Sequence, residues 1–274
     1  MSVITISGAA YGMSRKIAEG VALQMGYKCL GSEIITLASE QFNLSESELR
    51  EAVENAPSFL GMSLIKRVKL AAYLQSALAK YFLKDNIVYY GPAGEALIRA
   101  VAHVLKVRIH ADTAIRVQRM QTVENITENE AAKKLLKLDR NRHKVNSLLY
   151  KINESDQSVY DLVVELKESD TESVVSLISD EALLPKYKAS NYSVHCLKNI
   201  ELASRVKAAL INIDHEIDVR SNGILYIHTK AAEAEYKKRV NDINTAIAEI
   251  PGIHRVEITV TEDVFAQYAS SMIR

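Results

Sequence analysis

The chain has 274 residues, of which 48% are hydrophobic and 25% are charged, as in an ordinary globular protein. Lys plus Arg and Asp plus Glu number 34 each, so no excess charge favours nucleic acid or an anionic membrane. Tryptophan is absent, which argues against a base-stacking surface. The sequence shows no signal-peptide pattern, no apolar run of the ~20 residues that a membrane helix needs, and no metal-ligand spacing of cysteine or histidine. These features predict a cytoplasmic protein without a membrane span, a metal site or a nucleic-acid partner.

The chain opens with the segment SVITISGAAYGMSRK, in which an apolar strand at residues 3–7 runs through small residues into a helix that starts at Ser14. This order is typical of a phosphate-binding loop, because the N-terminus of a helix offers unpaired N–H groups to an anion. The usual Gly-x-x-x-x-Gly-Lys-Ser/Thr spacing is absent. The turn is therefore either a modified phosphate loop or only a connection between a strand and a helix.

Several elements follow in the middle of the chain. Ser45 and Glu48 predict a capping box at the start of a helix. An amphipathic helix is expected at residues 62–83, followed by an apolar strand at residues 86–91. The turn GPAG then leads into a helix expected over the segment EALIRAVAHVL, residues 95–105.

Two more strands, KVRIHA and YDLVVEL, are each followed by a helix, at residues 112–120 and 171–183. Between them, Thr127 and Glu130 predict a second capping box, which starts a long helix. Strands that alternate with helices in this way predict an α/β fold, in which a parallel sheet carries helices on both faces.

The pattern changes at LLPKYKASNYS, where Pro185 and its polar neighbours predict a linker. We expect one domain at residues 1–184 and a second at residues 194–274. The second part reads helix, strand, strand, helix, strand, and Asn222-Gly223 predicts a hairpin between its first two strands. This order is typical of a small α+β domain.

Segments of the first part resemble the cytidylate-kinase-like family of P-loop nucleoside monophosphate kinases. They are ITIS…RKIAE…MGYK, EIITLASE, NIVYYG, RVQRM, DRNR and YDLVVEL, in the family's order. The C-terminal segments ASRVKAAL, NGILYIHT and IAEIPGIHRVEITV resemble a BON-type domain. The first resemblance implies a P-loop-kinase-like sheet that binds a nucleotide or phosphate, with ATP and Mg as the expected cofactors. The second implies an interaction or regulatory module with a protein partner or with a second copy of the chain.

The first resemblance also assigns nucleotide-binding residues to the opening turn. They are Gly8, Ala9, Ala10, Tyr11, Gly12, Met13, Ser14, Arg15 and Lys16. Counted from the strand, Gly8 is the first loop glycine and Ser14 takes the place of the loop lysine. Counted from the helix, Ala9 and Ser14 replace the two glycines. Arg15 then replaces the lysine, and Lys16 replaces the hydroxyl that binds magnesium. Both registers lack the usual lysine, and Arg15 is its candidate replacement.

Further cations resemble the lid arginines of such kinases, which neutralise charge on the transferred phosphoryl group. They are Arg116, Arg119, Arg140 and Arg142. With Arg15, the residues Arg140 and Arg142 are the candidate catalytic groups, while Arg116 and Arg119 are candidates for nucleotide binding. The alternative is that these cations form a solvated helix face.

Two acceptor-side motifs of the family are replaced. Gly31 and Ser32 stand where an acidic and a basic residue are usual, and Pro92 stands where an arginine is usual. Three functions follow from these observations. The first, which we favour, is a nucleotide- or phosphate-binding protein that is catalytically degenerate and has an interaction domain. The second is an active kinase that transfers phosphate from ATP to CMP, dCMP or a related monophosphate. The third is a purely structural or interaction protein.

Overall fold

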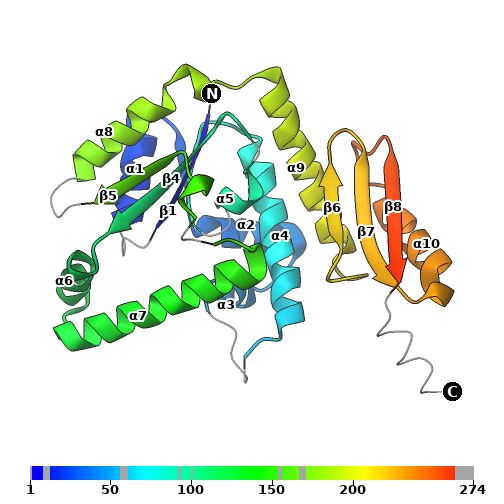
Figure 1. Cartoon of the computed structure of the whole chain (residues 1–274), viewed down its shortest axis with the longest axis horizontal. Helices are drawn as coiled ribbons and strands as arrows, with labels where there is room; N and C mark the ends of the chain where they lie inside the picture. The colour runs from blue at the N-terminus through cyan, green and yellow to red at the C-terminus, as the bar shows by residue number, and fades with distance from the viewer. Residues whose placement is uncertain are drawn as a thin grey trace.

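A computed structural model describes residues 2–8, 13–55, 61–91, 94–99, 101–153, 156–166 and 171–262. Within these ranges the chain forms a five-stranded parallel sheet followed by a three-stranded sheet (Figure 1). The expected α/β fold class, with a parallel sheet followed by a smaller α+β unit, is confirmed. None of the helices in these ranges has the length and apolarity needed to cross a bilayer.

The larger sheet has the strand order β2-β3-β1-β4-β5, and all its neighbouring strands are parallel. Its strands are β1 (Val3–Gly8), β2 (Lys28–Leu30), β3 (Ile87–Tyr90), β4 (Val104–Ala111) and β5 (Leu162–Leu166). Central strand β1 is mostly apolar, with the buried Thr5 between Ile4 and Ile6, because both of its faces are covered. Ile4 and Ile6 pack toward α1 and α8, whereas Val3 packs toward α2, α3 and α4 on the other face.

Helices cover both faces of this sheet. The helices of this unit are α1 (Met13–Met25), α2 (Glu33–Phe42), α3 (Glu46–Glu54), α4 (Leu64–Phe82), α5 (Gly94–Leu97), α6 (Thr113–Glu124), α7 (Glu128–Val145) and α8 (Thr171–Ala182). Helices α1 and α8 pack on one face, α2, α3, α4 and α5 pack on the other, and α6 and α7 pack against each other. Helix α7 continues into a π-helical turn, η1 (Asn146–Tyr150), and short 3-10 turns η2 (Gln157–Val159) and η3 (Pro185–Tyr187) follow. The capping box of Thr127 and Glu130 is confirmed at the start of α7.

Two local predictions were wrong. The helix expected over residues 95–105 ends at Leu97, because Val104 and Leu105 belong to β4 and pair with β1. Sheet pairing here overrides the helix propensity of the segment. At the start of α3, the Ser45 hydroxyl accepts a hydrogen bond from the N–H of Glu48, but the carboxylate of Glu48 pairs with Lys66 at 2.5 Å. The capping box is therefore only half formed.

The C-terminal unit consists of α9 (Asn191–Leu210), β6 (Asp218–Ser221), β7 (Leu225–Ala231), the 3-10 turn η4 (Glu233–Glu235), α10 (Tyr236–Ile247) and β8 (Val256–Glu262). The expected order of helix, strand, strand, helix, strand is confirmed. Strands β6 and β7 are antiparallel, and Gly223 in the turn between them has a φ of 100°. Strand β8 pairs parallel to β7.

Helix α9 connects the two units. It begins inside the segment expected to be a linker, because Ser190 caps its N-terminus. Leu197 near its start packs in the core beneath the larger sheet, whereas Val206 and Leu210 near its end pack in the core of the smaller sheet. Figure 1 shows α9 lying between the larger unit and strand β6. The division into residues 1–184 and 194–274 stays a prediction.

Candidate functional site

A cavity of about 340 Å³, here called the strand-end cavity, lies where β1, β3 and β4 end. Its described lining residues are Ile6, Ser7, Gly8, Ser14, Val53, Glu54, Tyr90, Gly91, Arg108, Leu138, Arg142, Val145 and Asn146. Ligands of open parallel sheets bind outside the carboxyl ends of the strands, as this cavity is placed. Three of the sequence candidates, Gly8, Ser14 and Arg142, therefore line the strand-end cavity.

Gly8 determines how closely β1 approaches β4 at the cavity. Its φ is 150°, which side chains with a Cβ rarely adopt, and a Cβ here would lie 2.0 Å from the carbonyl oxygen of Ile109. The strand end can take this position only with glycine. At this strand end, Ser7 lines the same cavity as Ser14 in the first turn of α1.

Two hydroxyl groups at the cavity have no partner among the described residues. The Oγ atoms of Ser7 and Ser14 are buried and find no hydrogen-bond partner among the described residues. Leaving a buried polar group unpaired costs about 1–3 kcal/mol. A ligand with acceptor oxygens removes this cost when it enters the cavity.

Two guanidinium groups supply positive charge. Arg108, on β4, donates from Nη1 to the hydroxyl of Tyr160 at 3.1 Å and lies over its ring at 5.4 Å. Arg142, on α7, also lines the cavity. Arg108 was not among the sequence candidates, although the two cations Lys106 and Arg108 in the otherwise apolar strand VLKVRIHA were an available signal. Arginine binds phosphate oxygens through paired N–H groups.

The remaining lid candidates lie elsewhere. Arg116, on α6, is buried and donates to both carboxylate oxygens of Asp139 on α7, at 2.6 and 2.9 Å. It therefore joins α6 to α7 instead of lining the cavity. Arg119 is half-buried and Arg140 is exposed, and neither lines the cavity. Of the four lid candidates, only Arg142 is part of the strand-end cavity.

Of the described candidates in the opening turn, some line the strand-end cavity and others do not. Ala9, Ala10, Tyr11 and Gly12 lie outside the described residues. Met13 is buried, whereas Arg15 and Lys16 are exposed and do not line the cavity. The Nε of Arg15 donates to Glu19 at 2.8 Å, and this hydrogen bond raises the pKa of Arg15. The described start of α1 thus presents the hydroxyl of Ser14 to the cavity, while its cations face solvent.

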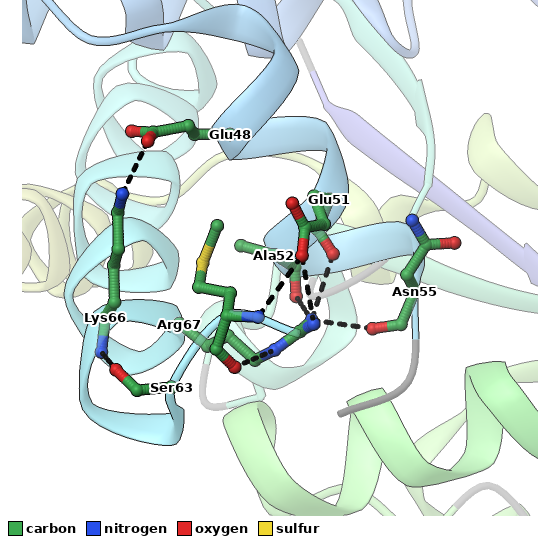
Figure 2. A network of polar contacts seen from close by, with 8 residues as sticks. Glu48, Glu51, Ala52, Asn55, Ser63, Lys66 and Arg67 are labelled. Carbon is green, nitrogen blue, oxygen red and sulfur yellow. Dashed lines mark hydrogen bonds and ion pairs between the residues drawn. The ribbon is translucent and has the colours of Figure 1, made fainter. Parts of the chain in front are cut away.

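Arg67 fixes the wall of the cavity that Val53 and Glu54 form at the end of α3. It lies in α4 with only 1% of its surface exposed, and its Nη1 donates to backbone carbonyl groups at the C-terminus of α3 (Figure 2). The acceptors are Glu51, Ala52 and Asn55, at 2.9, 3.2 and 2.7 Å. The carbonyl of Glu51 also accepts a hydrogen bond from the N–H of Asn55 at 3.3 Å. A cation near these carbonyl groups offsets the negative end of the helix dipole.

A smaller cavity of about 200 Å³, here called the Tyr90 cavity, lies next to the first. The two share Val53, Glu54, Tyr90 and Gly91. Gly31 also lines the smaller one, and a Cβ on Gly31 would lie 2.1 Å from the ring of Tyr90. The ring therefore packs directly on the backbone at Gly31. Burial raises the pKa of Tyr90, so its hydroxyl stays protonated and can donate a hydrogen bond at neutral pH.

The family model of the cytidylate kinase-like family matches residues 3–168, which is more than half of the chain. This chain belongs to the cytidylate kinase-like family. The prediction of a kinase-like first part is thereby confirmed. The matched region contains both cavities and all the candidate residues of the loop and the lid.

One curated relative is the cytidylate kinase of Methanocaldococcus jannaschii, which is 31% identical over 98 residues. The match covers 35% of this chain and 55% of that protein, so it spans about half the length of the relative. Among solved structures, an uncharacterized protein from Eubacterium ventriosum aligns with a TM-score of 0.49 and 12% identity, over 66% of this chain and 97% of its own. Shikimate kinase from Bacteroides thetaiotaomicron aligns with a TM-score of 0.43 and 10% identity, over 67% and 99%.

Proposed function

We propose that the strand-end cavity binds the phosphate groups of a nucleotide and that phosphoryl transfer there is slow or absent. The observation that carries this proposal is that the hydroxyls of Ser7 and Ser14, which have no partner among the described residues, line the same cavity as Arg108 and Arg142. Hydroxyl groups donate to phosphate oxygens, and arginine neutralises their charge. The N-terminal end of α1 adds the favourable end of a helix dipole at the same place.

Slow phosphoryl transfer is expected because the described start of α1 places no cation in the cavity. Arg15 is paired with Glu19 and Lys16 is exposed, so neither described cation of the helix start reaches the ligand position. In kinases of this fold a loop cation bridges the terminal phosphates. Loss of one preorganised stabiliser of transition-state charge reduces the rate by about 10²–10³-fold. A catalytic role for Arg15 or Arg140 would require these side chains to leave their present positions.

ATP with magnesium is the nucleotide form that the family implies. Magnesium in such sites keeps several waters and uses few protein oxygens beside those of the phosphates. The hydroxyl of Ser14, buried at the cavity and without a described partner, fits this requirement and is the group that would hold the ion. When bound, magnesium supplies charge neutralisation between the phosphates.

The alternative function is an active kinase for CMP, dCMP or a related monophosphate. It is favoured by the relative that carries the name cytidylate kinase and by the Tyr90 cavity, which adjoins the phosphate site and is lined mainly by apolar side chains such as Ile34, Ile35 and Leu74. A nucleoside there would lie with its monophosphate toward the strand-end cavity. Gly31 and Ser32, which line this cavity, provide no charge to hold that acceptor.

The test combines calorimetry with a coupled assay for ADP release. We expect the full chain to bind ADP and ATP in the presence of magnesium, and Arg142→Met to weaken binding at least about tenfold through loss of a charge-assisted contact. Lys137→Met, which removes one charge from an exposed position of α7, is the matched control. ATP-dependent phosphorylation of CMP at rates ordinary for kinases would establish the alternative. Absence of any nucleotide binding would leave a purely structural or interaction protein.

We also propose that the C-terminal unit is a BON-like interaction module. Its apolar residues, among them Val206, Ile227 and Ile243, gather between the sheet and helices α9 and α10. The other face of the sheet exposes polar side chains such as His228 and Thr259, which are paired neighbours on β7 and β8. Such a surface suits a modest polar contact with a protein partner or a second copy of the chain. Sedimentation of the full chain and of His228→Glu tests self-association through this face.

A further inference from the structure

A third cavity, of about 510 Å³, lies between the two units of the chain. Helix α9 and strand β6 form one side, and α4, α5 and η1 form the other. We call it the α9–η1 cavity. Its volume is in the usual range for a site that holds a small molecule. It is separate from the strand-end cavity, because Asn146 at the start of η1 lines that cavity, whereas Tyr150 and Lys151 at its end line this one.

The α9–η1 cavity has an excess of positive charge. Lys151, Lys207 and Arg220 line it, and Asp218 is the one carboxylate among its described lining residues. Asp218 already accepts a hydrogen bond from the Nε of Arg220 at 2.9 Å. The other two cations, Lys151 and Lys207, make no ion pair or side-chain hydrogen bond with the described part of the chain.

Lys207 is the most confined of these cations. It lies on α9, lines the cavity and is half-buried. Burial lowers the pKa of Lys207, and the nearby charge of Lys151 lowers it further, while Asp218 acts in the opposite direction. The charged form of Lys207 is therefore poorly compensated in the free protein. A group with two negative charges placed between Lys151 and Lys207 would compensate both.

We propose that the α9–η1 cavity binds a small metabolite that carries a phosphate or diphosphate group. The anionic group contacts Lys151 and Lys207. The remainder of the molecule contacts uncharged polar and apolar side chains, which include Gln75, Asn199, Leu149 and Ile200. Since the walls come from both units, the ligand joins the kinase-like part to the C-terminal part. This site lies outside the phosphate site of the proposed function and does not depend on it.

Calorimetry with pyrophosphate as the probe tests the proposal on the full chain. Arg142→Met is the background variant, because it weakens the strand-end cavity without touching the α9–η1 cavity. In this background we expect pyrophosphate to bind still, and Lys207→Met to weaken that binding about tenfold or more. Lys198→Met removes the same charge from an exposed position of the same helix and is the control, with an expected change below about twofold.

Lys151→Met gives a second measurement that does not alter α9. It replaces an exposed side chain at the end of η1 and should weaken pyrophosphate binding in the same direction. The proposal is overturned if Lys207→Met and Lys151→Met both bind pyrophosphate as Lys198→Met does. It is also overturned if Arg142→Met alone abolishes all binding. If Lys207→Met loses pyrophosphate binding, the α9–η1 site is supported. If Arg142→Met then leaves pyrophosphate binding unchanged from that of the unaltered chain, the phosphate site in the strand-end cavity is contradicted.

Discussion

Arg116 holds both carboxylate oxygens of Asp139, and the same carboxylate lies 3.3 Å from the guanidinium group of Arg142. One acidic side chain on α7 therefore anchors α6 through Arg116 and orients the arginine that lines the strand-end cavity. The pair with Arg116 is largely buried on the arginine side.

Asp139→Asn tests this arrangement. We expect the free energy of unfolding to fall by about 2–3 kcal/mol, because Arg116 stays buried without its charged partner. Nucleotide binding should weaken as well, since Arg142 loses its orientation. Urea unfolding and calorimetry measure the two effects. Asp180→Asn, at an exposed position of α8, is the control and should change neither quantity. Equal stability of the two variants would contradict the anchoring role.

Arg67 provides a second test of how the cavity wall is held. Arg67→Met removes the guanidinium donor from three carbonyl groups at the end of α3, of which only that of Glu51 keeps a backbone donor among the described residues, the N–H of Asn55. We expect a loss of about 3 kcal/mol or more in the free energy of unfolding. Lys66→Met removes the neighbouring charge, whose pair with Glu48 is exposed, and should cost less than about 1 kcal/mol. A similar loss in both variants would show that the carbonyl contacts contribute little.

Alanine substitutions at Gly8 and Gly26 distinguish the effect of a steric clash from the effect of backbone strain. Gly8→Ala must place a methyl group against the backbone of Ile109, so we expect both a large loss of stability and loss of nucleotide binding. Gly26 also has a positive φ, of 67°, but nothing lies within 4 Å of the position of its Cβ. Gly26→Ala should therefore cost only about 1–2 kcal/mol and leave binding unchanged. Thermal unfolding and calorimetry with ADP distinguish the two, and intact binding by Gly8→Ala would refute the steric argument.

Cys29 gives a prediction about pH. Burial raises its pKa to about 11, with further contributions from Glu19 and Glu33. A raised thiol pKa means that the reactive thiolate is scarce at neutral pH and accumulates only as the pH rises toward 11. In a Cys196→Ser background, alkylation by iodoacetamide should be slow at pH 8 and should accelerate about tenfold for each pH unit up to that pKa. A rate that levels off below pH 9 would contradict the burial effect.

The sequence predicted the alternation of strands and helices well, because apolar runs and capping signals such as Thr127 are local features. It failed at residues 95–105, where pairing of Val104 with Val3 decides between helix and strand and cannot be read from neighbouring residues. It also missed the start of α9, because the capping box there pairs the N-cap Ser190 with Ser193 and not with the Glu or Gln that a capping box normally uses.

The candidate site was predictable to a similar extent. Gly8 and Ser14 were found because the strand-to-helix turn has a recognisable order. Arg108 was missed because its place depends on which face of β4 meets the cavity, and Arg116 was assigned to the ligand because its partner Asp139 lies on another helix. Family resemblance identifies the residue types of a lid, but the contacts of each arginine depend on the packing of α6 against α7.

Helix α9 has a consequence for how the chain unfolds. Leu197 belongs to the core beneath the five-stranded sheet, Val206 belongs to the core of the three-stranded sheet, and Ala72 of α4 also packs in that second core. Neither core can lose this helix without exposing apolar surface in both. The two sheets should therefore melt in a single cooperative transition, with equal calorimetric and van't Hoff enthalpies, although a multi-domain chain commonly departs from this behaviour.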